Sequence, residues 1–412
     1  MGNKLNKNVP VLRFPEFEGD WQSQKLKNIL IESNVLASEE LPLYSLTIES
    51  GIVPKTERYE RSFLVKNEEE AYKVVQPNDF AYNPMNLRFG ALARHTESKL
   101  VKVSKYYNIF SVNPKANVIF VDYLLTKSSS IRFYDSIAMG SLVEKKRVHF
   151  SDFLNSKFLL PSIAEQEKIA SLLGAIDRRL TQLRRKRKLL QTYKRGVMQK
   201  IFSQKIRFKD AIGSEFPEWE RKKLGNIAID GFSNGVFNDP NKVGKGYRLI
   251  NVKDMYEGDS INVETLSRLL IDEKEFVKNQ AKYGDIFFTR SSLVKEGIAH
   301  SNVLLTNDSD ITYDGHLIRF RFDIEENNPQ FMAFLLKSSI ARKQLFARGK
   351  TGTMTTIGQE DITTVKIPIP DKQEQEKIAN FLTAIDRKIE TISRQIDQTE
   401  QFKKGLLQKM FV

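Results

Sequence analysis

Apolar and polar positions alternate with a seven-residue period in two long segments of this chain, residues 165–202 and 374–411. In the first segment the apolar stripe is formed by Ile169, Ile176, Leu183, Leu190 and Val197, with Leu173, Leu180 and Ile201. In the second it is formed by Ile378, Ile385, Ile392 and Leu406, with Leu382, Ile389, Ile396 and Met410. A sustained heptad pattern is typical of a coiled-coil seam, so we predict two long helices of about 57 Å each.

The two segments are also copies of each other. They align without a gap at an offset of 209 residues, with 17 of 38 positions identical. A weaker repeat precedes each copy, because Trp21-x-x-x-Lys25-Leu26-x-Asn28-Ile29 returns as Trp219-x-x-x-Lys223-Leu224-x-Asn226-Ile227. We therefore predict two tandem units of about 200 residues, each a globular domain followed by a long helix. Matching stripes in one chain can bury each other in an antiparallel pair.

Four polar residues interrupt the two seams: Arg187, Lys194, Thr399 and Lys403. A buried, unpaired charge is costly, so we expect these stretches to splay, to extend their charged ends to solvent, or to meet acidic groups of another protein. Pro161 and Pro370 stand just before the helices, where a missing N–H costs little, and Ser162 or Asp371 can cap the helix that begins there.

The segments before the helices have the pattern of mixed α/β domains. We predict strands at Leu100–Val103, Val118–Val121, Leu317–Phe322 and Val365–Ile369. We predict helices at Tyr123–Ser136 and Pro329–Ala347, where apolar residues have helical spacing. The copies share this framework, including Asp79-Phe80-Ala81-Tyr82 against Asp285-Ile286-Phe287-Phe288, while the segments between barely align. If loops contact the ligand, the two domains recognise different things, which favours a bipartite, asymmetric target.

Composition narrows the class of protein. The chain has 412 residues, no cysteine and a formal net charge of +14. The absence of cysteine excludes disulfides and thiolate metal sites. The net positive charge favours a protein that binds a polyanion such as nucleic acid, over one whose charge serves solubility alone. No stretch has the ~18 apolar residues of a membrane span, and the start MGNKLNKNVPVLRF lacks the apolar core of a signal peptide, so we expect a cytoplasmic protein.

The sequence offers no convincing catalytic motif. Asn83-Pro84-Met85-Asn86 lacks the second proline and the aromatic residue of an amino-methyltransferase loop. Gly349-Lys350-Thr351 lacks the earlier glycine of a phosphate-binding loop, where Gln344 stands instead. The histidines have no ligand-like spacing: His95, His149, His300 and His316. We expect no catalytic, cofactor-binding or metal-binding residues in this chain.

The paired blocks Glu165-Gln166-Glu167-Lys168-Ile169 and Glu374-Gln375-Glu376-Lys377-Ile378, each before a long helix, resemble the specificity subunit of type I restriction-modification systems. The resemblance implies a non-catalytic subunit in which two α/β target-recognition domains each read half of a split sequence in double-stranded DNA. It implies that the antiparallel coiled-coil helices separate the domains, with pseudo-twofold symmetry, and that two methyltransferase subunits dock around one copy, joined by motor-nuclease subunits. S-adenosylmethionine, ATP and Mg are then expected on the partner subunits.

The expected domains are residues 1–160 and 205–368 for recognition, with 161–204 and 369–412 as the spacer helices. Candidates for DNA contact lie in polar loops: Lys55, Arg58, Tyr59, Arg61, Asn83, Asn86, Arg88, Asn251, Lys253, Arg290, Ser291, Ser292, Lys295, His316, Lys350 and Thr351. Candidates for partner binding lie on the helices: Glu165, Gln166, Lys168, Arg187, Lys194, Glu374, Gln375, Lys377 and Lys403.

Three other interpretations stay open. The first is a structural or regulatory DNA-binding protein that dimerises through its coiled coil. The second is an enzyme that cuts or methylates DNA itself, against which the missing motifs argue. The third is an isolated helical hub for protein–protein contacts, which leaves the two large divergent domains unexplained. The partner of each helix separates the first interpretation from a specificity subunit, since the seam would then be filled by a second copy of the chain.

Overall fold

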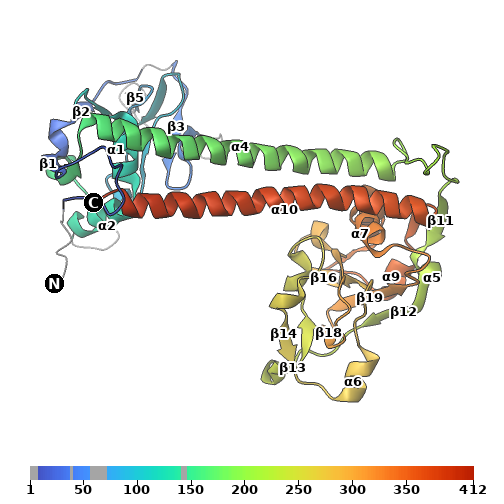
Figure 1. Cartoon of the computed structure of the whole chain (residues 1–412). Coiled ribbons are helices and arrows are strands. Elements are labelled where there is room, and N and C mark those ends of the chain that lie inside the picture. The colour runs from blue at the N-terminus through green and yellow to red at the C-terminus, as the bar shows by residue number, and fades with distance from the viewer. Residues whose placement is uncertain (1–7, 38–39, 56–71, 141–145) are drawn as a thin grey trace. The chain divides into compact units, whose positions relative to one another are not determined.

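The computed structural model describes residues 8–37, 40–55, 72–140 and 146–412. The chain divides into two compact units, each of which takes residues from both long helices. Unit 1 comprises residues 1–183 and 395–412, and unit 2 comprises residues 184–394. The long helices are α4 (Ile163–Phe202) and α10 (Lys372–Lys409), drawn in green and red in Figure 1. The compact units therefore cut across the sequential domain boundaries predicted from the sequence, because each border falls in the middle of a helix.

Unit 1 is built on a four-stranded antiparallel sheet in the order β2-β9-β6-β7. Its other strands form the pairs β1-β10, β3-β4 and β5-β8. The strands are β1 (Gln22–Lys25), β2 (Leu30–Ser33), β3 (Tyr44–Thr47), β4 (Gly51–Pro54), β5 (Tyr72–Val75), β6 (Phe80–Tyr82), β7 (Leu92–Arg94), β8 (Val101–Ser104), β9 (Asn108–Val112) and β10 (Lys157–Leu160). The helices before α4 are η1 (Leu26–Asn28), η5 (Leu87–Phe89), α1 (Val118–Thr126), α2 (Ser128–Ile137) and α3 (Phe150–Asn155).

Unit 2 repeats the central sheet in the order β12-β19-β15-β17, and its pair β11-β22 repeats β1-β10. It also contains the small sheets β14-β13-β18 and β16-β21-β20. Its strands are β11 (Glu220–Lys223), β12 (Ala228–Asn234), β13 (Val243–Ile250), β14 (Ser267–Leu269), β15 (Ile286–Thr289), β16 (Ser291–Ser292), β17 (Ser301–Val303), β18 (Ile311–Tyr313), β19 (Leu317–Phe322), β20 (Lys350–Thr351), β21 (Thr355–Thr356) and β22 (Lys366–Ile369). Its helices before α10 are α5 (Leu224–Ile227), η7 (Pro240–Lys242), η8 (Lys253–Tyr256), η9 (Val263–Thr265), α6 (Glu273–Lys278), η10 (Lys295–Gly297), α7 (Pro329–Lys337), α8 (Ser339–Arg348) and α9 (Gln359–Thr363).

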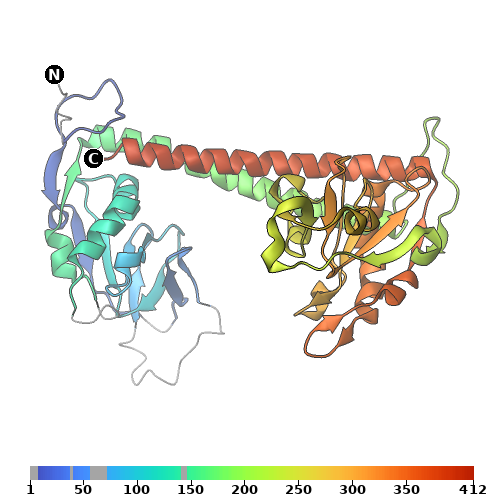
Figure 2. The ribbon, with the colours of Figure 1, turned by 90° about the horizontal axis from the view of Figure 1, so that it is seen from below.

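The heptad stripes are buried within each unit, as the sequence predicts. In unit 1, Ile169 and Leu173 of α4 and Met410 of α10 are almost fully buried. In unit 2, Ile201 of α4 joins Ile378 and Leu382 of α10 in the main core cluster. Figure 2 shows α4 and α10 from a second side. The seam that a coiled-coil dimer would need is therefore filled by the chain's own helices in both units.

Two of the polar interruptions form matching ion pairs. Lys194 of α4 pairs with Asp386 of α10 in unit 2, and Lys403 of α10 lies 2.6 Å from Asp177 of α4 in unit 1. Both the lysines and the aspartates are related by the same offset of 209 residues. The expectation that these lysines splay or meet another protein was wrong, because each finds its carboxylate on the opposite helix of its own chain.

The predicted strands at 100–103, 317–322 and 365–369 are confirmed, with boundaries shifted by at most a residue. The predicted strand at 118–121 was wrong, because these residues begin α1. The side chain of Asn117 accepts hydrogen bonds from the backbone N–H groups of Ile119 and Phe120, which caps a helix at this point. The predicted helices at 123–136 and 329–347 are each two helices, broken by extended backbone at Lys127 and Ser338.

Among the described residues, none of the helices combines the length and apolar character that crossing a membrane requires.

Candidate nucleic-acid interface

Most of the candidates in unit 2 gather around the small sheet β16-β21-β20. Ser291 and Ser292 pair with Thr356 and Thr355, and the hairpin from β20 brings Lys350 and Thr351 to the other side of β21. Arg290 precedes this sheet and connects it to the central sheet, because its N–H donates to the His316 carbonyl and its own carbonyl accepts from the Ile357 N–H. The Arg290 and Lys350 side chains are exposed. Segments that lie far apart in the sequence thus form one polar surface.

A second group of candidates adjoins this surface through Asp314. The His316 ring lies 2.8 Å from the Asp314 carboxylate and is 68% exposed, so it can contact a ligand while it is held in place. Asn238 donates to both Asp314 and Asn251. The Asn251 amide in turn donates to Ser267, which fixes the side chain and occupies groups that a base would need. We conclude that Asn251 orders the loop more than it faces a ligand, whereas Lys253 is exposed at the start of η8.

In unit 1 three of the four described candidates lie between β6 and β7. Asn83 is half-buried, and its side-chain oxygen accepts from the Met85 N–H, which shapes the turn, while Asn86 is exposed. Arg88 lies 3.1 Å from Asp135 and over the Phe89 ring at 4.5 Å. Lys55 is half-buried just after β4. The three remaining candidates lie outside the described residues: Arg58, Tyr59 and Arg61.

The two glutamates that begin the long helices are internal ties. In unit 1, Glu165 accepts from Arg13 at 2.9 and 2.8 Å and from the Trp21 indole at 3.2 Å. In unit 2, Glu374 accepts from Arg207 at 3.3 and 2.7 Å and from the Trp219 indole at 3.0 Å.

Both of these carboxylates are almost fully buried, at 1% and 0% exposure. Each fastens the start of a long helix to an arginine and to a tryptophan that stands directly before a β-strand. A buried, fully bonded carboxylate cannot reach a partner without breaking these bonds.

The glutamines beside them have the same internal role. Gln166 accepts from the Asn117 N–H at 2.9 Å and Gln375 accepts from the Asn328 N–H at 2.8 Å, so each ties its long helix to the helix that follows the central sheet. The lysines close by in sequence, Lys168 and Lys377, are more exposed and lie over Phe14 and Phe216. Among the other partner candidates, Arg187 is half-buried. Lys194 and Lys403 are also half-buried, but their ammonium groups are paired with Asp386 and Asp177.

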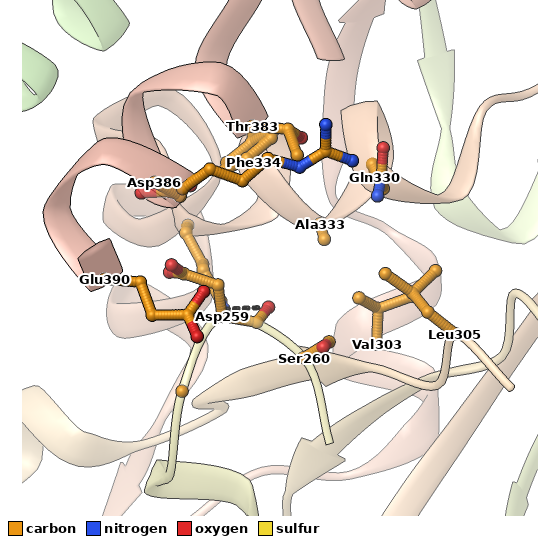
Figure 3. A pocket seen from close by; sticks show the side chains of 13 residues that line it. Asp259, Ser260, Val303, Leu305, Gln330, Ala333, Phe334, Thr383, Asp386 and Glu390 are labelled. Atoms are coloured by element: carbon orange, nitrogen blue, oxygen red, sulfur yellow. Dashed lines mark hydrogen bonds between the residues drawn. The ribbon is translucent and has the colours of Figure 1, made fainter. Parts of the chain in front are cut away.

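Unit 2 also contains a cavity of about 300 Å³ between α7, α10 and residues 258–260, seen from close by in Figure 3. Asp386 and Asp259 both lie against Lys194 at its edge, and the Lys337 ammonium donates to the Asp259 carbonyl at 3.1 Å. Burial, partly offset by Lys194, raises the pKa of Asp386 to about 6. In unit 1 the corresponding carboxylate, Asp177, is paired with Lys403 and also accepts from the Tyr123 hydroxyl at 2.5 Å.

Sequence reasoning missed exposed apolar side chains beside the candidate surface. Phe237 is 76% exposed next to Asn238, and Leu293 is 85% exposed next to Ser292. It also missed Gln359, whose amide donates to Asn234 at 2.6 Å at the end of β12. The signal was available for Leu293, because Leu-Val follows Arg-Ser-Ser in a segment otherwise rich in polar residues.

Comparison with known proteins agrees with this architecture. The family model described as the type I restriction modification DNA specificity domain matches residues 217–401. The MjaVIII specificity subunit of a type I restriction enzyme from Methanocaldococcus jannaschii is 28% identical over 62% of this chain and 61% of that protein, which is less than two thirds of its length. The putative MjaX specificity subunit from the same organism is 24% identical over 95% of this chain and 93% of that protein.

A solved structure shares the fold. The crystal structure of the S subunit of a type I restriction-modification system from M. genitalium aligns with a TM-score of 0.58 at 14% identity, over 98% of this chain and 99% of that chain. The repeated domains, the two long helices and the match to the family model all indicate the same architecture. The chain is thus similar in sequence to curated specificity subunits of type I restriction enzymes, and it shares the fold of a solved S subunit.

Proposed function

We propose that this chain gives a type I restriction-modification complex its DNA sequence specificity, with one half of a bipartite target read by each unit. The observation that carries the proposal is the contrast between a repeated scaffold and diverged loops. The central sheets have the same strand order in both units, whereas the sheet β16-β21-β20 of unit 2 and the turn between β6 and β7 of unit 1 carry different side chains. Two readers that differ in this way suit two unlike half-sites.

The chain acts without catalysis of its own, and its partners supply the chemistry. Two methyltransferase subunits dock around one copy, and motor-nuclease subunits join them, with S-adenosylmethionine, ATP and Mg bound by those partners. Because chromosomal DNA is the ligand, we place the complex in the cytoplasm. Purified chain incubated with DNA and labelled S-adenosylmethionine should transfer no methyl group until methyltransferase subunits are added, and transfer by the chain alone would contradict the proposal.

The long helices set the gap between the half-sites. Half-sites about 34–36 Å apart, one turn of DNA, face the same side of the duplex, and helices of 40 and 38 residues are long enough to match such a gap at about 1.5 Å per residue. The burial of both seams inside the chain supports one copy per complex. It also disfavours the alternative of a coiled-coil dimer, which would need the same apolar stripes.

The test of sequence reading is to map methylated sites in cells that express the complex with variants of the chain. Arg290→Ala should relax the preference at a single base position of the half-site read by unit 2, if the guanidinium binds a guanine edge. Arg88→Ala should act on the other half-site alone. A variant that changed both half-sites would contradict the assignment of one half-site to each unit. Unchanged half-sites together with a uniform loss of binding and a flatter salt dependence would identify a phosphate contact instead.

A further inference from the structure

The small sheet of unit 2 ends in an apolar tip. Ser292 of β16 faces Thr355 of β21, and the next residue beyond this pair on each strand is Leu293 and Met354. Leu293 is 85% exposed and Met354 is 40% exposed, and Val294 continues the apolar run at 61%. Large apolar side chains gathered at an exposed hairpin end, rather than scattered singly, indicate a contact surface.

The base of the tip is held firmly. Arg342 of α8 donates to the carbonyls of Ala299 and Glu296 at 2.6 and 2.8 Å, which fastens the segment that follows Leu293. On the other strand, a Cβ added at Gly349 would lie 2.9 Å from the Thr355 side chain, so the hairpin is packed closely where it leaves α8. The tip is therefore presented on a supported element.

The surroundings of the tip are hydroxyl groups and cations. Ser291, Ser292 and Thr351 lie on its strands, and Lys295 lies over the Phe346 ring at 4.8 Å on one side. Arg290 is exposed at the base, and Lys350 is 76% exposed with its ammonium 3.5 Å from Asp361. Cationic side chains can bind the phosphates of DNA, and hydroxyl groups can bind phosphates or base edges.

An apolar tip inside such a rim has one match among the base edges of the major groove. In the major groove the edges of the bases present hydrogen-bonding groups, except that thymine also presents its C5-methyl group. We propose that Leu293 and Met354 read the C5-methyl group of thymine in the half-site recognised by unit 2. This inference rests on the proposed function and makes thymine at one or two positions a specific requirement of that half-site.

The experiment uses the assembled complex of the full chain with methyltransferase subunits, and duplexes that carry the mapped target. Single thymidines in the target are replaced by 2′-deoxyuridine, which removes the methyl group and leaves base pairing intact. The unmodified complex should lose about fourfold in affinity for each contacted methyl group, the value expected for one buried methyl-sized group. The positions should fall in the half-site of unit 2.

Leu293→Ser and Met354→Ser should bind the thymine and uracil duplexes equally well at those positions. Both residues are exposed, so the variants should unfold at the same urea concentration as the unmodified chain. Ile212→Ser is the matched control, because Ile212 is 88% exposed elsewhere in unit 2, and this variant should keep the preference for thymine.

Three results would overturn the inference. One is an unmodified complex that is indifferent to uracil at every position, and another is a Leu293→Ser variant that keeps the full preference. The third is loss of methyltransferase binding by Leu293→Ser, which would assign the tip to a protein partner. Failure of the proposed function is distinguishable, because the unmodified complex would then bind the target no better than a scrambled duplex.

Discussion

Replacing Glu374 by glutamine tests whether each of the repeated glutamates stabilises its own unit or docks a partner. The substitution keeps the shape of the side chain and removes its charge. Glu374 is fully buried, and its carboxylate accepts two bonds from Arg207 and one from Trp219. An amide group in this position would place its own N–H₂ against these donors, and Arg207 would lose its buried counter-charge and keep the exposed Glu218, 3.5 Å away.

The expected loss of unfolding free energy follows from the burial of the ion pair between Glu374 and Arg207. Removing one partner of a buried ion pair costs about 3–5 kcal/mol of unfolding free energy. The Arg207 side chain is 20% exposed and keeps bonds to the carbonyls of Phe216 and Pro217 at 3.1 and 2.6 Å, so part of its charge remains solvated. We therefore expect the lower end, about 3 kcal/mol.

The assay is urea denaturation of the full chain followed by tryptophan fluorescence, with hydrogen exchange of β11 and β22 to locate the effect. Glu376→Gln, on an exposed position of the same helical turn, is the control and should change the unfolding free energy by less than about 0.5 kcal/mol. A Glu374→Gln variant of unchanged stability that no longer bound methyltransferase would refute the structural role. It would restore the sequence-based prediction that this residue meets a partner.

Further predictions concern Asp386 in the seam between the long helices and two glycines, one in a crowded and one in an open position. Burial raises the pKa of Asp386 to about 6, so the folded state keeps a proton that the unfolded state releases near pH 4. The unfolding free energy should therefore fall as pH rises from about 4 to about 6. In urea titrations at each pH, Asp386→Asn should flatten this decline, and the same dependence on pH in the variant would contradict the raised pKa of Asp386. A Cβ at Gly235 would lie 1.9 Å from the Tyr313 carbonyl oxygen, so Gly235→Ala should lower the midpoint of thermal unfolding through about 1–3 kcal/mol of overpacking. Gly196→Ala, inside α4 with open space around it, should instead raise that midpoint through about 1 kcal/mol of helix propensity, and a loss of stability there would show a contact that the structure lacks.

Sequence reasoning located the large elements because their signals are periodic and repeated. The heptad stripes predicted both long helices and their pairing, and the repeat around Trp21 and Trp219 supported the division into two similar units. The run from Val118 to Val121 was misread because continuous apolar residues fit a buried strand and a buried helix equally. The deciding group was the Asn117 side chain, which caps the helix and lies one residue before the apolar run.

The site was harder to predict because side chains of the same type serve opposite purposes. Asn251 and Lys253 both lie in a polar loop, yet the amide of Asn251 is used inside the fold and Lys253 is exposed. Glu165 and Glu374 were assigned to a partner surface because both copies kept them. The structure gives a different reason for that identity, since each copy uses its glutamate to fasten an arginine and a tryptophan. The arginines escaped notice because Arg13 and Arg207 stand at different distances from their tryptophans.

The most direct test of the account lengthens both helices at the unit borders. Seven residues with heptad pattern are inserted after Leu183 in α4 and after Arg394 in α10, which keeps the phase of each stripe and adds about 10 Å to each helix. Genome-wide mapping of methylated sites should then show the same two half-sites with a gap longer by up to about three base pairs, at about 3.4 Å each. Altered half-sites, or an unchanged gap in a complex that still methylates, would contradict the claim that two separate readers are spaced by the paired helices.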